Sequence, residues 1–335
     1  MKKIIHSLPS LFLFLLLCLF AACGDDATTT TSSNSDSGDT SSGITDITNA
    51  TFTRTSGDCA DYVGSFKSAI TDLGNNTAFA GSLVIATSNN ECTFATNSIP
   101  NHDVNNEDSF RTAIAEVSAT YTVTAAPTDA GSTTDLSLSY DNAIFLNGAK
   151  LDILPAACYG VGPDPLGQEK IGCFQLTYAW RYDPMFSGND FGTDNHNAHT
   201  QPNGAYHYHG NPLAMFDNDS PTSASPVIGF AADGYPIYGP YIDDGGTIRE
   251  VQSSYSLRSG TRDIADLPGG LTEGAAPGGT YDGTFRDDYE YVASSGDLDE
   301  CNGMTVNGVY GYYVTNAFPW VMNCFKGTPD PSFAK

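Results

Sequence analysis

The stretch Val227-Ile228-Gly229-Phe230-Ala231-Ala232-Asp233-Gly234-Tyr235-Pro236-Ile237-Tyr238 holds two short apolar segments on either side of an Asp-Gly pair. Asp-Gly between two apolar segments is typical of a β-hairpin turn, because glycine adopts positive φ without steric cost. The stretch therefore predicts two antiparallel strands, over residues 227–230 and 235–238.

Short apolar segments bounded by Gly, Asn, Asp and Pro recur along most of the chain, without the strand–helix alternation of a parallel sheet. They predict a mainly β protein, a single large antiparallel β-sandwich or barrel-like domain with long loops over residues 58–335. The further predicted strands are residues 82–86, 119–124, 136–140, 143–146, 174–178, 205–209, 289–292 and 310–314.

One N-terminal helix is expected over residues 58–73. Its apolar residues recur at the spacing of one helical face, and Gly74 follows as a stop signal. These residues are Cys59, Tyr62, Val63, Phe66, Ile70 and Leu73.

The chain has 335 residues and a formal charge of −25, from 14 Lys and Arg against 39 Asp and Glu. So negative a protein repels phosphate backbones, which argues against nucleic acid as a partner. Hydrophobic residues make up 40% of the chain, enough for a core, so wholesale disorder is excluded.

The N-terminus has the features of an export signal. Lys2 and Lys3 precede an apolar segment at residues 11–20, which is short for a membrane-spanning helix. The following Phe20-Ala21-Ala22-Cys23 resembles a bacterial lipobox, although leucine is usual where Phe20 stands. The resemblance implies that residues 1–22 are a lipoprotein signal peptide and that Cys23 is lipidated. We expect a protein anchored by lipid to the bacterial cell envelope, at the outer membrane.

Residues 23–57 are expected to form a disordered tether behind the lipidated cysteine. Between residues 27 and 57, 17 of 31 residues are Ser or Thr. Such a segment cannot bury enough apolar surface to offset its chain entropy. It would hold the folded domain away from the membrane.

Six cysteines remain after Cys18 and Cys23, and an even number in an exported protein predicts disulfide bonds. Fifteen pairings are possible, and sequence proximity favours Cys59–Cys92, Cys158–Cys173 and Cys301–Cys324. A thiolate metal site is disfavoured, because no closely spaced CxxC pair occurs.

Four histidines lie within 14 residues: His196, His199, His207 and His209. In a strand, His207 and His209 would point to one face, about 7 Å apart, where two imidazoles can share an ion. The turn over residues 201–204 could bring His196 or His199 beside them. His102 and Asp194 are further candidate ligands.

Imidazole ligands favour a transition metal, and copper or zinc is expected. The alternative is that these histidines only form hydrogen bonds within the fold. A second candidate site is calcium at Asp297, Asp299 and Glu300, where the alternative is a solvated acidic turn.

Tyr206-His207-Tyr208-His209-Gly210 resembles the signature of the bacterial YHYH-domain proteins, and further segments resemble that family in the same order. The family's members are typically exported, and the resemblance implies no assigned activity. Gly311 stands where a histidine is expected, which would alter metal binding if that histidine is a ligand. The further segments are residues 98–102, 144–148, 194–199, 228–239, 281–285, 298–303 and 318–320.

Three functions remain open. The favoured hypothesis is an envelope-anchored lipoprotein with a histidine-rich copper or zinc site and no stated reaction. The first alternative is a zinc-dependent hydratase or hydrolase, in which three imidazoles leave one coordination position open. The second is a non-catalytic surface adhesion or glycan-binding module. The expected partners are a membrane, through the lipid, and a metal ion.

Overall fold

The computed structural model describes residues 43–164, 166, 170–272 and 276–335. The predicted signal peptide, Cys23 and the first part of the tether, through residue 42, lie outside these residues. Within the described residues, no helix is both long and apolar enough to span a membrane.

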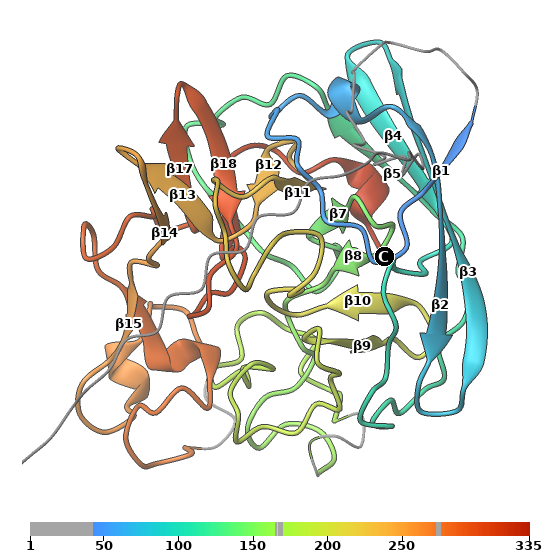
Figure 1. Cartoon of the computed structure of the whole chain (residues 1–335). Coiled ribbons are helices and arrows are strands. Elements are labelled where there is room, and N and C mark those ends of the chain that lie inside the picture. Colours follow the sequence, from blue (N-terminus) through green and yellow to red (C-terminus); the bar gives the residue numbers. More distant parts are fainter. Residues whose placement is uncertain (1–42, 165, 167–169, 273–275) are drawn as a thin grey trace, which may run out of the picture. The chain divides into compact units, whose positions relative to one another are not determined.

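The fold is mainly β, as predicted, and most strand pairs are antiparallel (Figure 1). The first sheet has five strands in chain order: β1 (Ile44–Asp46), β2 (Gly64–Asp72), β3 (Thr77–Ser88), β4 (Glu91–Thr96) and β5 (Ala119–Thr124).

The second sheet has eight strands in the order β17-β18-β12-β11-β7-β8-β10-β9. The pairs β8·β10 and β12·β18 are parallel, as is β1·β2 in the first sheet. Its strands are β7 (Ala143–Phe145), β8 (Lys150–Leu151), β9 (Ala198–Thr200), β10 (Tyr206–Tyr208), β11 (Val227–Ala231), β12 (Pro236–Tyr238), β17 (Gly303–Val306) and β18 (Val309–Tyr313).

The two large sheets pack against each other around one hydrophobic core. Leu83 and Ile85 of β3 belong to the same buried cluster as Phe145 of β7. The rings of Phe94 in β4 and Phe230 in β11 lie 5.9 Å apart. No sheet in the described part of the chain closes on itself, so the fold is sandwich-like and not a barrel.

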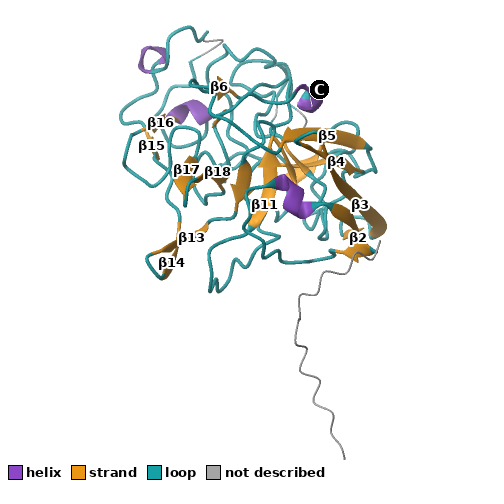
Figure 2. Cartoon of the chain, turned by 90° about the horizontal axis from the view of Figure 1, so that it is seen from above, coloured by secondary structure: helices purple, strands orange, loops and turns teal. Residues whose placement is uncertain are grey.

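Short strand pairs, 3-10 helices and long loops make up the rest, as Figure 2 shows in orange, purple and teal. The strand pairs are β13 (Tyr241–Asp244) with β14 (Thr247–Glu250), β15 (Tyr255–Leu257) with β16 (Tyr289–Tyr291), and β6 (Thr134–Asp135) with β19 (Cys324–Phe325). The 3-10 helices are η1 (Cys59–Tyr62), η2 (Ile264–Asp266), η3 (Arg286–Asp288) and η4 (Pro331–Phe333).

The Asp233-Gly234 hairpin is confirmed. β11 and β12 pair antiparallel, and Gly234 takes φ 90° at the turn. Two predicted strands, residues 136–140 and 174–178, are not strands in the structure.

The predicted helix over residues 58–73 is wrong. Only its first turn is helical, as η1, and β2 follows. Val63 and Leu73, which the helical face would bury, are 49% and 50% exposed. Ile70 alternates with exposed neighbours and packs in the core, because β2 pairs with β3 along all nine of its residues. Phe66 and Ile70, four residues apart, share one face in a helix and also in a strand. The long-range pairing with β3 therefore selects the strand.

The folded domain also begins earlier than residue 58. Residues 43–57 are assigned to the tether by sequence, yet Ile44–Asp46 pairs with β2. The backbone N–H of Phe52 donates to the Met215 carbonyl at 2.7 Å. Residues 43–57 therefore belong to the folded part of the chain.

The three predicted disulfide bonds are confirmed. Cys59–Cys92 joins η1 to β4, Cys158–Cys173 closes a loop, and Cys301–Cys324 ties the chain just before β17 to β19.

Candidate metal centre

The site is built on the β9–β10 hairpin at one edge of the eight-stranded sheet. β10 pairs antiparallel with β9, which places His199 directly opposite His207. His209 follows β10 by one residue and therefore points to the same face as His207. A short turn between two strands thus brings three imidazoles together.

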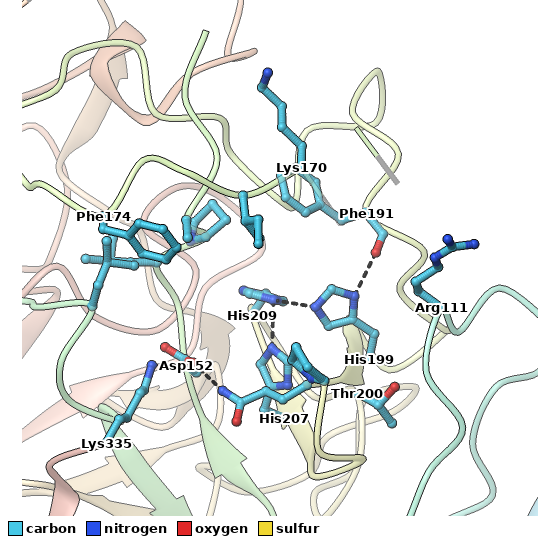
Figure 3. A pocket seen from close by; sticks show the side chains of 17 residues that line it. Arg111, Asp152, Lys170, Phe174, Phe191, His199, Thr200, His207, His209 and Lys335 are labelled. Carbon is cyan, nitrogen blue, oxygen red and sulfur yellow. Dashed lines mark hydrogen bonds and ion pairs between the residues drawn. The ribbon is translucent and has the colours of Figure 1, made fainter. Parts of the chain in front are cut away.

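The Nε2 atoms of the three rings converge. The Nε2 atom of His209 lies 3.1 Å from that of His207 and 3.0 Å from that of His199 (Figure 3). A tetrahedral zinc ion with Zn–N bonds of about 2.0–2.1 Å requires nitrogens about 3.3 Å apart. If the Nε2 atoms moved apart by a few tenths of an ångström, such an ion would fit between them. Among the His, Cys, Asp and Glu side chains of the described residues, these three histidines are the group whose donor atoms lie close enough together to hold a metal ion.

Backbone carbonyls hold two of the rings by their other nitrogen. His199 Nδ1 lies 2.7 Å from the Phe191 carbonyl, and His209 Nδ1 lies 3.2 Å from the Ile153 carbonyl. In each case Nδ1–H donates, so Nε2 carries the lone pair that a metal would bind. His207 Nδ1 is buried and has no hydrogen-bond partner among the described residues.

The rings are held in the neutral form that a metal requires. His207 and His209 are 4% and 3% exposed. Burial lowers the pKa of both well below its ordinary value, and the neighbouring imidazoles lower it further. His207 and His209 are therefore held in the neutral form at neutral pH.

The triad faces an open hollow of about 240 Å³ (Figure 3). Much of its wall is apolar, and Phe191 and Phe174 lie on different sides of the imidazoles in this view. An ion held by three nitrogens would keep its remaining position toward this hollow. The apolar wall consists of Leu138, Leu154, Pro155, Ala156, Ile171, Phe174, Phe191 and Pro202.

A network of charged groups lies beside the triad. Lys150, paired in register with His207, donates to both oxygens of Asp141 at 2.9 and 3.0 Å. Lys335 Nζ donates to Asp152 Oδ2 at 2.5 Å. These two cations and two carboxylates balance one another, and Arg111 and Lys170 also line the hollow.

Asp152 is the member of this network that has one carboxylate oxygen without a hydrogen-bond partner among the described residues. Its Oδ2 also accepts from Gln201 Nε2 at 2.7 Å, while its Oδ1 is buried without a partner in the described part of the chain. Asp152 lines the same hollow as the triad. Burial raises the pKa of this carboxyl, although Lys335 acts in the opposite direction.

The tyrosines that alternate with the histidines in β10 fix the strand from its other face. Tyr206 OH donates to Asp194 Oδ2 at 3.0 Å. Tyr208 OH donates to His102 Nε2 at 2.5 Å, because Nδ1–H of that ring donates to the Asp103 carbonyl. The alternation therefore separates a histidine face from a tyrosine face that anchors the strand.

Three predicted ligands lie on this tyrosine side, away from the triad. The rings of His102 and His196 stack on each other with centroids 3.7 Å apart. Asp194 accepts hydrogen bonds from Tyr206 OH and from the backbone N–H groups of Asn105 and His196. These residues stabilise loops, and the prediction that they share the histidine site is not supported by their positions.

The calcium candidates are not brought together either. Both oxygens of Asp297 accept from the Arg249 guanidinium, at 2.8 and 2.9 Å. Asp299 accepts from the backbone N–H groups of Cys301 and Gly303. The carbonyl of Glu300 accepts from Tyr255 OH. The acidic segment forms turns and an ion pair.

Gly311 lies far from the triad. It is in β18, five strands from β10 in the same sheet, which at about 4.8 Å per strand is roughly 24 Å. A histidine at position 311 could not complete the triad. The glycan-binding alternative would use exposed aromatic rings, and Tyr235 and Tyr241 do not offer them, because both side chains are buried.

No sequence motif singles out Asp152, Lys150 or the carbonyls of Ile153 and Phe191 for this site. The strand β8 has two residues and carries no recognisable motif. Its place beside β10 comes from a parallel pairing between distant segments, which leaves no local signal.

Together these features define a mainly β protein with an open three-histidine site on one sheet edge. The family model described as "YHYH protein" matches residues 120–327, well over half of the chain, so the chain belongs to this family. No curated protein and no solved structure is significantly similar to it.

Proposed function

We propose that this protein binds one transition-metal ion, zinc or copper, at His199, His207 and His209, and uses the ion's open position for chemistry in the adjoining hollow. The observation that carries the proposal is the convergence of three Nε2 atoms at an open pocket. Three neutral imidazoles suit zinc and copper. A storage site would be expected to enclose its ion with four protein ligands.

Zinc would support a hydratase or hydrolase reaction. A zinc ion with three imidazoles lowers the pKa of bound water to about 7. Asp152 lines the same hollow and would serve as the proton acceptor, and the apolar wall would lower the polarity around the ion.

Equilibrium dialysis against zinc and copper, with metal analysis, tests binding. We expect about one tightly held ion per chain. His207→Ala should weaken binding by more than about 100-fold, since loss of an outer-shell partner alone costs 10–100-fold. His196→Ala is the matched control, because that ring lies on the tyrosine side and should leave binding unchanged. Absence of binding at micromolar metal would refute the site.

Cobalt(II) substitution tests the open position. Tetrahedral cobalt absorbs visible light strongly, and its bands shift when a ligand is exchanged. Azide should shift the spectrum of the cobalt-loaded protein. A spectrum that azide does not alter would indicate a closed site and favour metal storage or sensing.

We further propose that the mature chain is attached to the bacterial envelope by lipid on Cys23. The support is the apolar segment at residues 11–20, followed by Ala21-Ala22-Cys23. Cys23→Ala should abolish incorporation of a labelled fatty acid and release the protein from membranes. Labelling of the variant equal to that of the wild type would refute the assignment.

A further inference from the structure

A second hollow, of about 400 Å³, lies beside the metal pocket and shares Leu154 with it. It is lined by three arginines, Arg181, Arg258 and Arg286, in a protein with only 14 Lys and Arg. Two of these guanidinium groups are buried. Such a concentration of cations requires an explanation.

Arg181 and Arg258 are already engaged. Arg181 donates through Nη1 to the carbonyls of Pro155 and Cys173 and through Nη2 to that of Gln175. Arg258 donates to the Asp287 carbonyl and lies 3.4 Å from a Glu290 oxygen. Both arginines therefore have structural partners.

Arg286 differs from them. It is 8% exposed, and its Nη1 is buried without a hydrogen-bond partner among the described residues. No carboxylate of the described chain lies within ion-pair distance of it, and the charges of Asp183 and Asp287 act on it from farther away. A buried charge without a partner is costly, so buried guanidinium groups normally meet an anion.

The guanidinium is held in a fixed orientation. Its Nη2 donates to Asn323 Oδ1 at 2.7 Å, and Asn323 Nδ2 donates to Tyr255 OH at 2.8 Å. The guanidinium lies 4.7 Å from the centre of the Phe318 ring, on which Tyr289 also stacks. Asn323, Tyr255 and Tyr289 line the hollow with Arg286, so polar groups and ring surface adjoin the unpaired donor.

From this arrangement we propose that the hollow binds the carboxylate group of a small organic acid, with the Arg286 guanidinium as the principal donor and the tyrosine rings against the ligand's carbon skeleton. Three acids, Asp135, Asp287 and Glu290, also line the hollow and balance the arginines formally. A monoanion therefore fits better than a phosphate dianion. The inference is independent of metal at the triad.

Calorimetric titration of the full chain, freed of metal with a chelator, tests this inference. The probes are sodium benzoate, sodium acetate, inorganic phosphate and neutral benzamide. We expect benzoate to bind more tightly than acetate, and phosphate and benzamide not to bind below about 20 mM. Lack of benzoate and acetate binding in the same range would overturn the proposal. Tighter binding of phosphate would overturn the carboxylate assignment.

Variants locate the bound anion. Arg286→Gln should weaken benzoate binding at least about tenfold, because a charge-assisted hydrogen bond is lost. Arg249→Gln is the matched control, since this arginine lies in β14 and pairs with Asp297. If Arg286→Gln does not fold, Arg286→Lys keeps the charge but loses the planar fork and should also weaken binding. Unchanged affinity in the folded variant would refute the site.

Discussion

The buried ring of His102 predicts how the free energy of unfolding depends on pH, and the size of the effect can be calculated. The ring is buried, stacks on His196 and accepts a hydrogen bond from Tyr208. Burial, followed by the charge of His196, lowers its pKa from 6.5 to about 3. In the unfolded chain the ring takes up a proton below about pH 6.5, while in the folded protein it stays neutral down to about pH 3.

The sign of the effect follows from this difference. Between pH 6.5 and 3 the unfolded chain binds more protons, so the free energy of unfolding falls as the pH falls. For a pKa of about 3 in place of 6.5, the loss attributable to His102 between pH 7 and pH 5 is about 2 kcal/mol. The loss stops growing below about pH 3.

The assay is urea unfolding of the wild type and of His102→Gln at pH 7, 6 and 5. Glutamine does not titrate, so the stability difference between the two proteins isolates the histidine while all other groups cancel. The difference should shift by about 2 kcal/mol in favour of the variant between pH 7 and pH 5. A difference that stays constant with pH would show that the ring titrates in the folded protein as it does in the unfolded chain, and would refute the reasoning.

Three further outcomes are expected. Replacing both Cys301 and Cys324 with Ser should lower the free energy of unfolding by about 3 kcal/mol, as estimated from their separation of 23 residues and measured by urea unfolding against the disulfide-bonded wild type. Gly311→Ala should destabilise by about 1–3 kcal/mol, because the new Cβ would lie 2.5 Å from Cε2 of Tyr238; a melting temperature equal to that of the wild type would contradict the packing. Zinc at a hundred times its Kd should stabilise the wild type by about 2.7 kcal/mol and should not stabilise His207→Ala, as checked by thermal unfolding with and without metal.

Local signals predicted much of the fold and part of the site. The Asp-Gly turn located β11 and β12, because its backbone geometry depends on two adjacent residues. The pairing of His207 with His209 followed from the two-residue period of a strand. His199 joined them through a short turn, which the sequence allowed without choosing it over His196. Sequence proximity was enough to pair the cysteines.

The errors arise where more than one arrangement fits the same local pattern. The segment 58–73 has apolar residues that satisfy a helical face, and its pairing with β3 decides otherwise. His102 and His196 are chemically suitable ligands, but they approach β10 from the side of its tyrosines.

The sequence alone determined the β class of the chain, its disulfide pairs and the shared face of two histidines, because each depends on residues near one another along the chain. Only the tertiary structure decided that His199 completes the triad, that Asp152 lies beside it, and that Arg286 is buried with one nitrogen lacking a hydrogen-bond partner among the described residues. These features depend on contacts between segments far apart in sequence, where burial and pairing across the whole domain outweigh any local preference.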